Sequence, residues 1–133
     1  MSNDQAIKQR CRGPYRAINF AEKLKLFDDQ WQARVVAEMN DYQFKLVRIE
    51  GDFVWHEHAD TDETFIVLDG QLRIDMRDGS VLLSAGEMFV VPKGTEHKPY
   101  AEHEVKLLLI EPRGVKNTGG DINERTAAND VWI

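Results

Sequence analysis

The clearest alternation of apolar and polar side chains runs from residue 71 to residue 77. Every second residue there is apolar, which predicts a strand whose buried face carries Leu72, Ile74 and Met76. The Asp78-Gly79 pair follows and predicts a tight hairpin turn into a second strand over residues 81–83.

Residues 42–49 carry two alternations that are out of phase. Up to residue 46 the apolar positions are even-numbered, and polar Gln43 and Lys45 lie between them, as in a half-buried strand with its apolar side chains inside (Tyr42, Phe44, Leu46). From residue 47 the apolar positions are odd-numbered, Val47 and Ile49. This shift predicts either a β-bulge or a strand that is buried on both faces.

The rest of the chain shows short elements separated by regular turn signals. Asn19 is a good N-cap, with Glu22 as the glutamate of a capping box, for a short helix over residues 20–27. Further β-prone runs cover residues 31–39, 88–91 and 105–110, and the first ends at the turn pair Asn40-Asp41. Short strands with such regular turns predict an all-β barrel or sandwich.

Both ends of the chain differ from this β-rich middle. Residues 1–14 are polar, contain Gly-Pro and the single cysteine, Cys11, and predict a loosely ordered arm with a tolerated surface thiol. Residues 113–133 are rich in Gly, Asn and Asp but finish on Trp132-Ile133. This tail either docks onto the barrel or a second subunit, or stays loosely ordered.

Length and charge limit the classes of function. A chain of 133 residues is expected to form one domain. The net charge of −6 and the lack of a basic stripe argue against nucleic acid as a partner. No apolar run approaches the roughly 20 residues that a membrane span requires, and no secretory signal is visible, so we expect a cytoplasmic protein without membrane contacts.

The segment His56-Glu57-His58 carries the candidate chemistry. On a strand, residues two apart share a face, so the two imidazoles can converge on one ion. A turn through residues 59–62 can bring Glu63 to the same point, and His97 follows a second pair of strands. Imidazole and carboxylate together suit a divalent transition metal. The remaining histidine, His103, lies between two glutamates and is expected to be solvated.

Two segments resemble the two motifs of the cupin family. The first reads Gly51, four residues, His56-Glu57-His58, four residues, Glu63, six residues and Gly70. The second reads Gly86, five residues, Pro92-Lys93-Gly94, two residues, His97, three residues and Ala101. Two departures leave every ligand in place: Gly51 is one residue closer to the first histidine than usual, and Ala101 replaces the usual asparagine.

The resemblance implies a fold and a metal site. It is closest in kind to small single-domain bacterial cupins, some labelled RmlC-like or mannose-6-phosphate-isomerase-like, and implies a double-stranded β-helix, or jelly-roll barrel, over residues 31–112. Residues 1–30 would then form an arm with a short helix, and residues 113–133 a tail. The implied metal ligands are His56, His58, Glu63 and His97, holding one ion of Fe, Ni, Mn, Zn or Cu. The resemblance also implies a homodimer.

Strand periodicity predicts what surrounds the metal. Val54 should share the face of His56 and His58, and the other residues expected to face inward are Phe65, Val67, Pro99 and Ala101. Trp55, Glu57, Thr64 and Ile66 should point the other way. Of the inward residues, Val67 is expected to be barrel core, and Phe65 is either core or cavity wall. Lys98 and Tyr100 are either substrate-positioning residues or exposed turn residues, and we favour the second interpretation.

These features predict a metal-dependent enzyme acting on a small oxygen-rich organic molecule. The reaction is either oxidation or dioxygenation, or isomerisation at a carbonyl, with Glu63 as a ligand that can also serve as a base. The alternative is a protein that binds or senses a small molecule through the metal without catalysis. A purely structural metal is disfavoured, because four ligands leave coordination positions open.

Overall fold

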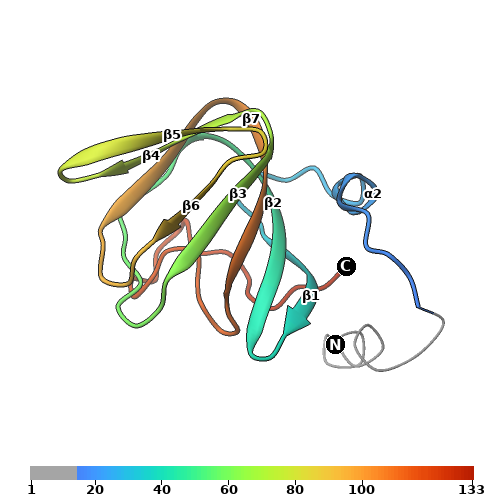
Figure 1. Cartoon of the computed structure of the whole chain (residues 1–133). Helices are drawn as coiled ribbons and strands as arrows, with labels where there is room; N and C mark the ends of the chain where they lie inside the picture. Colours follow the sequence, from blue (N-terminus) through green and yellow to red (C-terminus); the bar gives the residue numbers. More distant parts are fainter. Residues whose placement is uncertain (1–14) are drawn as a thin grey trace.

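The computed structural model describes residues 15–133, so the predictions for residues 1–14, including that for Cys11, lie outside the described residues. The elements in chain order are α2 (Phe20–Leu24), β1 (Arg34–Met39), β2 (Tyr42–Asp52), β3 (Glu63–Asp69), β4 (Gln71–Met76), β5 (Gly79–Ser84), β6 (Met88–Val91) and β7 (His97–Pro112). The predicted all-β fold with a short N-terminal helix is confirmed (Figure 1).

Strand β7 organises the sheet because it pairs with three other strands. Its first residues pair with β4, and its later residues lie between β2 and β3. All of these pairings are antiparallel, and the strand order is β1-β2-β7-β3-β6, with the β4–β5 hairpin joined through β7. The strands curve around a common interior, with the hairpin projecting at one side (Figure 1).

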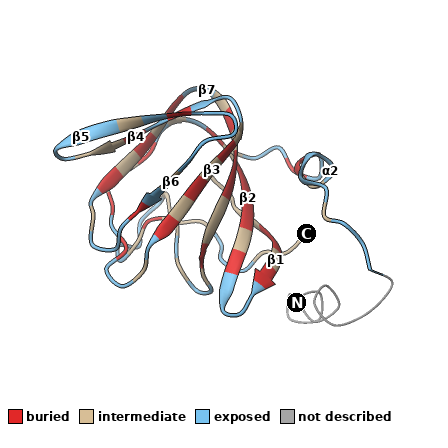
Figure 2. Cartoon of the chain, viewed as in Figure 1, coloured by how far each residue is buried: buried red, intermediate tan, exposed pale blue. Residues whose placement is uncertain are grey.

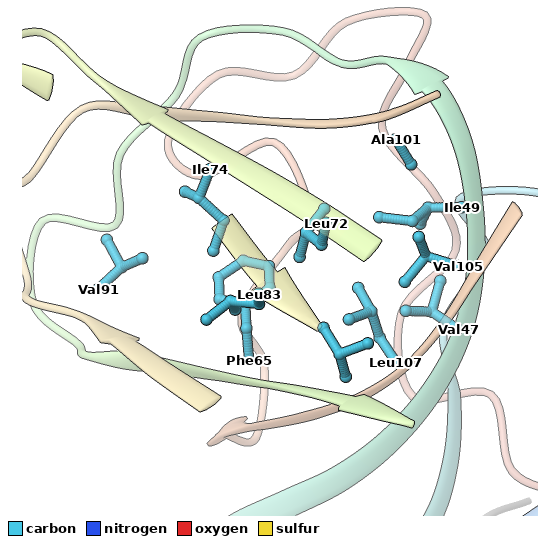
Figure 3. Close-up of a cluster of buried hydrophobic side chains, with 11 residues drawn as sticks. Val47, Ile49, Phe65, Leu72, Ile74, Leu83, Val91, Ala101, Val105 and Leu107 are labelled. Atoms are coloured by element: carbon cyan, nitrogen blue, oxygen red, sulfur yellow. The ribbon is translucent and has the colours of Figure 1, made fainter. Parts of the chain in front are cut away.

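The interior of the barrel is filled by apolar side chains from nearly every strand (Figure 3). Buried positions occur along most of the strands (Figure 2). Leu72 and Ile74 of β4 are fully buried, as their alternation predicts. They pack with Val47, Ile49, Phe65, Val67, Leu83, Val91, Ala101, Val105 and Leu107. Burial of such side chains contributes on the order of 1.5–3 kcal/mol each, which makes this cluster the main source of stability.

Strand β2 is buried on both faces, and this corrects the predicted orientation of its first half. Gln43 and Lys45 point inward and are 0% and 4% exposed, whereas Tyr42 is 43% exposed. The outer face at Leu46 is covered by a second apolar cluster that includes residues of α2 and the segment after it (Leu24, Phe27, Val36, Leu108). The register of β2 with β7 is continuous from Tyr42 to Ile49, so the phase shift within β2 reflects two covered faces. The register shift with β1 places an extra residue in β1, between Val35 and Ala37, and none in β2.

Two predicted boundaries move by a few residues. Asn19 caps the helix through its Oδ1, which accepts the backbone N–H of Glu22 at 3.0 Å, but the helix ends at Leu24. The hairpin turn comes one residue earlier than predicted, because Met76 pairs with Gly79 and leaves Arg77-Asp78 as the turn.

The C-terminal tail docks onto the barrel of its own chain. The backbone of Val35 in β1 accepts from Ile133 at 3.1 Å and donates to Val131 at 2.7 Å. Further inside, the side chain of Gln43 donates to Asp130 at 2.9 Å.

None of the helices in residues 15–133 is long and apolar enough to cross a membrane.

Candidate metal centre

Three separate segments bring the four candidate ligands together. Glu63 and His97 are the first residues of β3 and β7, and His56 and His58 lie in the segment after β2. This segment is not the regular strand that the sequence predicted. Its only strand-like contact is a bridge in which the backbones of His56 and His97 exchange two hydrogen bonds, at 3.1 and 2.9 Å.

The four side chains converge at a buried point. One ligand atom from each residue lies within 4.8 Å of the others. The Oε1 atom of Glu63 is 3.2 Å from Nε2 of His58 and 3.3 Å from Nε2 of His97. His97 is 0% exposed, and the other three side chains are also buried.

The Nδ1 atoms of two imidazoles are engaged by backbone carbonyls, which leaves their Nε2 atoms as the ones that can bind an ion. Nδ1 of His56 lies 2.9 Å from the carbonyl of Val54, and Nδ1 of His97 lies 2.9 Å from the carbonyl of Thr95. A carbonyl only accepts, so both Nδ1 atoms donate, and the tautomer with an unprotonated Nε2 is the one that can bind an ion. Nε2 of His97 also lies within hydrogen-bond distance of Oε1 of Glu63, at 3.3 Å. Nε2 of His58 is buried and has no hydrogen-bond partner. The donor set and this unpaired atom fit a transition-metal ion.

The pKa shifts of His56 and Glu63 also suit metal ligands. Burial and the nearby charge of His97 lower the pKa of His56 from 6.5 to about 4. Burial alone would raise the pKa of Glu63, but the close imidazoles of His58 and His97 outweigh it and hold that pKa well below its usual value. A neutral imidazole beside an ionised carboxylate is the state that binds a cation near neutral pH.

A cavity of about 60 Å³ opens beside the cluster. His56 and Glu63 contribute to its wall, and most of the rest is apolar: Val47, Ile49, Phe65, Pro99, Leu107 and Leu109. Phe65 and Pro99 therefore face the cavity, whereas Val67 and Ala101 belong to the core. The volume has room for about four to six water molecules, at roughly 10–15 Å³ each.

Phe53, not Val54, faces the cavity, which corrects the prediction for this segment. The strand ends at Asp52, so period-2 alternation does not continue into the residues before His56. The ring of Phe53 stacks on Trp31 at 4.6 Å, and its other neighbour is the edge of His56 at 5.4 Å. Arg125 from the tail lies over the Phe53 ring at 4.8 Å. The tail thus helps to hold Phe53, whose ring contacts His56.

Lys45 and Glu111 are cavity residues that the sequence analysis did not identify. Nζ of Lys45 donates to Oε2 of Glu111 at 2.9 Å, and each side chain is 5% exposed. Burial and the adjacent charge of Glu63 raise the pKa of Glu111 to about 8, although Lys45 opposes this. The sequence did contain a signal for Lys45. It lies two and four residues before Val47 and Ile49 on the same strand, and so shares their face.

The remaining candidates lie outside the cavity wall. Nζ of Lys98 donates to Asp52 at 3.1 Å, and the ring of Tyr100 lies under the guanidinium of Arg73 at 4.6 Å. His103 and Glu57 are exposed. Trp55, Thr64 and Ile66 are half-buried and do not line the cavity, in agreement with the predicted outward direction.

A curved all-β barrel with a buried His₃Glu cluster at its interior defines a class of potential metal-binding protein. The model of the cupin domain matches residues 45–111. The chain therefore belongs to the cupin family, and its barrel is the cupin double-stranded β-helix.

Three proteins that are 35–63% identical to this chain support this assignment. A cupin-2 domain containing protein from Shewanella frigidimarina is 63% identical, with a TM-score of 0.72 over 73% of this chain and 95% of that one. Protein NMB1881 from Neisseria meningitidis is 35% identical, with a TM-score of 0.67 over 73% of this chain and 99% of that one. YdbB from Bacillus subtilis strain 168 is 42% identical over 77 residues, which is 57% of this chain and 68% of that protein.

Proposed function

We propose that this cupin holds one divalent transition metal through His56, His58, Glu63 and His97 and acts as an enzyme on a small oxygen-rich organic molecule. The observation that supports this best is the convergence of four buried ligand atoms within 4.8 Å at the wall of a mostly apolar cavity. The protein already folds around a large apolar core, so the ion has no necessary structural role.

The residues around the site suit catalysis. Four protein ligands leave one or two positions of a five- or six-coordinate ion for a small molecule. When bound, the metal supplies a Lewis acid, and Fe, Ni or Cu would also supply redox chemistry. The apolar wall limits the access of water, which strengthens electrostatic interactions within the cavity. Glu63 is proposed as a ligand and, when released, as a base for a substrate proton.

Two reaction types fit this arrangement. In a dioxygenation, O₂ is the oxidant and both of its atoms are incorporated into the organic product. In an isomerisation at a carbonyl, a proton leaves one carbon and another is returned to its neighbour, and no co-reactant is consumed. Fe, Ni or Cu in the purified protein would support the first type, and Zn or Mn the second.

We also propose a cytoplasmic homodimer. The β6 strand lies at the end of the strand order and exposes Met88 and Val90, which are 58% and 39% exposed. A second copy that pairs along this edge would cover both side chains. Sedimentation velocity should give twice the monomer mass.

The central experiment measures the metal content of matched histidine variants. His58→Ala should lose most of its bound metal while its circular dichroism remains that of a folded β protein. His103→Ala is the matched control, because His103 is exposed on β7, and it should keep the metal content of the wild type. An unchanged metal content in His58→Ala would refute the ligand assignment.

Turnover separates an enzyme from a binding protein. Oxygen consumption and product formation are measured with small 2-hydroxy and 2-keto acids in the metal-loaded protein. If the compounds bind at the metal but all of them are recovered unchanged, the proposal of an enzyme is refuted in favour of a metal-dependent binding protein.

A further inference from the structure

The cavity wall contains an ion pair that the proposed metal site does not need. Lys45 on β2 and Glu111 on β7 are joined at 2.9 Å and are 5% exposed each, yet both line the cavity. Removing two such groups from water costs several kcal/mol per ion, so a buried pair is a poor way to gain stability. Its position beside the candidate metal centre suggests a role in binding.

The strand register places this pair next to Glu63. Thr64 of β3 lies opposite Ile110 of β7, and continuing this antiparallel register by one residue sets Glu63 opposite Glu111. Directly opposed residues have Cβ atoms about 4.5–5.5 Å apart. Gln43 lies on the other side of Glu111, so Lys45 reaches Glu111 diagonally from the same face of β2. Three adjacent strands thus present the polar side chains side by side toward the interior.

The pair retains unused hydrogen-bonding capacity. Oε1 of Glu111 is buried and has no hydrogen-bond partner. Nζ of Lys45 has three N–H groups, of which one is used by Glu111 and another reaches the carbonyl of Val115 only at 3.5 Å. A free acceptor and a free donor on neighbouring groups match a hydroxyl, which accepts from the ammonium of Lys45 and donates to Oε1 of Glu111.

The charge around the cavity and the volume of the cavity limit the chemical class of the ligand. A divalent ion and the ammonium of Lys45, set against the carboxyls of Glu63 and Glu111, leave at least one net positive charge, which favours an anion. A cavity of about 60 Å³ admits only a few non-hydrogen atoms.

We propose that Lys45 and Glu111 bind a hydroxyl group of the molecule held at the histidine–glutamate cluster, and that this molecule belongs to the small 2-hydroxycarboxylates. Its carboxylate would occupy the open position on the metal, and its hydroxyl would lie between Nζ of Lys45 and Oε1 of Glu111. This inference rests on the proposed metal site and adds a substrate class and two specificity-determining residues.

The test compares two probes that differ by one hydroxyl group, acetate and glycolate. Both are titrated into the protein loaded with one Co²⁺, and binding is followed by the visible absorption of the cobalt. The variant is Lys45→Met with Glu111→Leu, which replaces the ion pair by apolar side chains of similar volume and so preserves the fold. The matched control is Lys106→Met with Glu102→Leu, which changes the same residue types on the outside of β7.

The expected result is a loss of discrimination. The ratio of the dissociation constants of acetate and glycolate should fall about tenfold or more in the Lys45/Glu111 variant, because hydrogen bonds to charged groups contribute about 1.5–3 kcal/mol. The dissociation constant of acetate should stay the same, and the control should match the wild type in both. The single variants Lys45→Met and Glu111→Gln should each lose part of the ratio.

Three outcomes would contradict the inference or its foundation, and they are distinguishable. An unchanged ratio would show that the pair does not bind the hydroxyl. An equal loss of affinity for both probes would show that the pair only orients Glu63. A wild-type protein that binds neither Co²⁺ nor acetate would refute the proposed metal site itself.

Discussion

The C-terminal tail supports the segment that carries two of the candidate metal ligands, and a single glycine tests this. Gly119 has φ +70 and lies against the backbone of Glu57, which stands between His56 and His58. A Cβ added at Gly119 would overlap the carbonyl of Glu57. The change Gly119→Ala should therefore push the tail and the His56–His58 segment apart.

A second glycine of the tail separates this overlap from backbone strain. Gly114 also has a positive φ, +91, but a Cβ there would meet nothing within 4 Å. Gly114→Ala should cost only the strain of a left-handed alanine, about 1–2 kcal/mol. Gly119→Ala should cost this strain and a further 1–3 kcal/mol or so for the overlap with backbone. Its total cost in the free energy of unfolding is then about 2–5 kcal/mol.

The two variants are compared by urea unfolding of the metal-free proteins and by titration with Co²⁺. Gly119→Ala should be less stable than Gly114→Ala and should bind the ion more weakly, whereas Gly114→Ala should bind it as the wild type does. Equal stabilities and equal metal affinities in the two variants would refute the coupling between the tail and the histidine segment.

The remaining predictions concern pH and the anchoring of the tail. Because the pKa of His56 falls from 6.5 to about 4 on folding, the unfolded chain takes up this proton first as the pH drops. Between pH 6.5 and 4 the metal-free protein should lose about 3 kcal/mol from this group. His56→Gln should show a correspondingly shallower loss in urea unfolding at a series of pH values. Arg113→Met removes two hydrogen bonds to buried Glu38, at 2.9 and 2.6 Å, and should cost about 2 kcal/mol at neutral pH. Since Arg113 lowers the pKa of Glu38 below 4.5, this stabilisation should disappear as the pH falls through that range, and an unchanged difference between the variant and the wild type at low pH would contradict it.

Local sequence predicted the elements whose causes are local. The alternation at Leu72 and Ile74 marked a strand with one buried face, and Asn19 marked the start of the helix. The spacing of the histidines and Glu63 indicated their convergence, through a shared strand face for His56 and His58 and a turn over residues 59–62 for Glu63. The convergence itself was achieved without the regular strand that the prediction assumed, through one bridge between His56 and His97.

The sequence by itself therefore predicted an all-β fold, most of its strands and the four converging side chains. Only the tertiary structure decided that Lys45 points inward, that Glu111 lies beside Glu63, and that the tail contributes to the cavity wall. The physical reason is that period-2 alternation defines two faces of a strand but not which one is interior. That choice depends on what covers each face, and in β2 the apolar cluster around Leu46 covers the outer one.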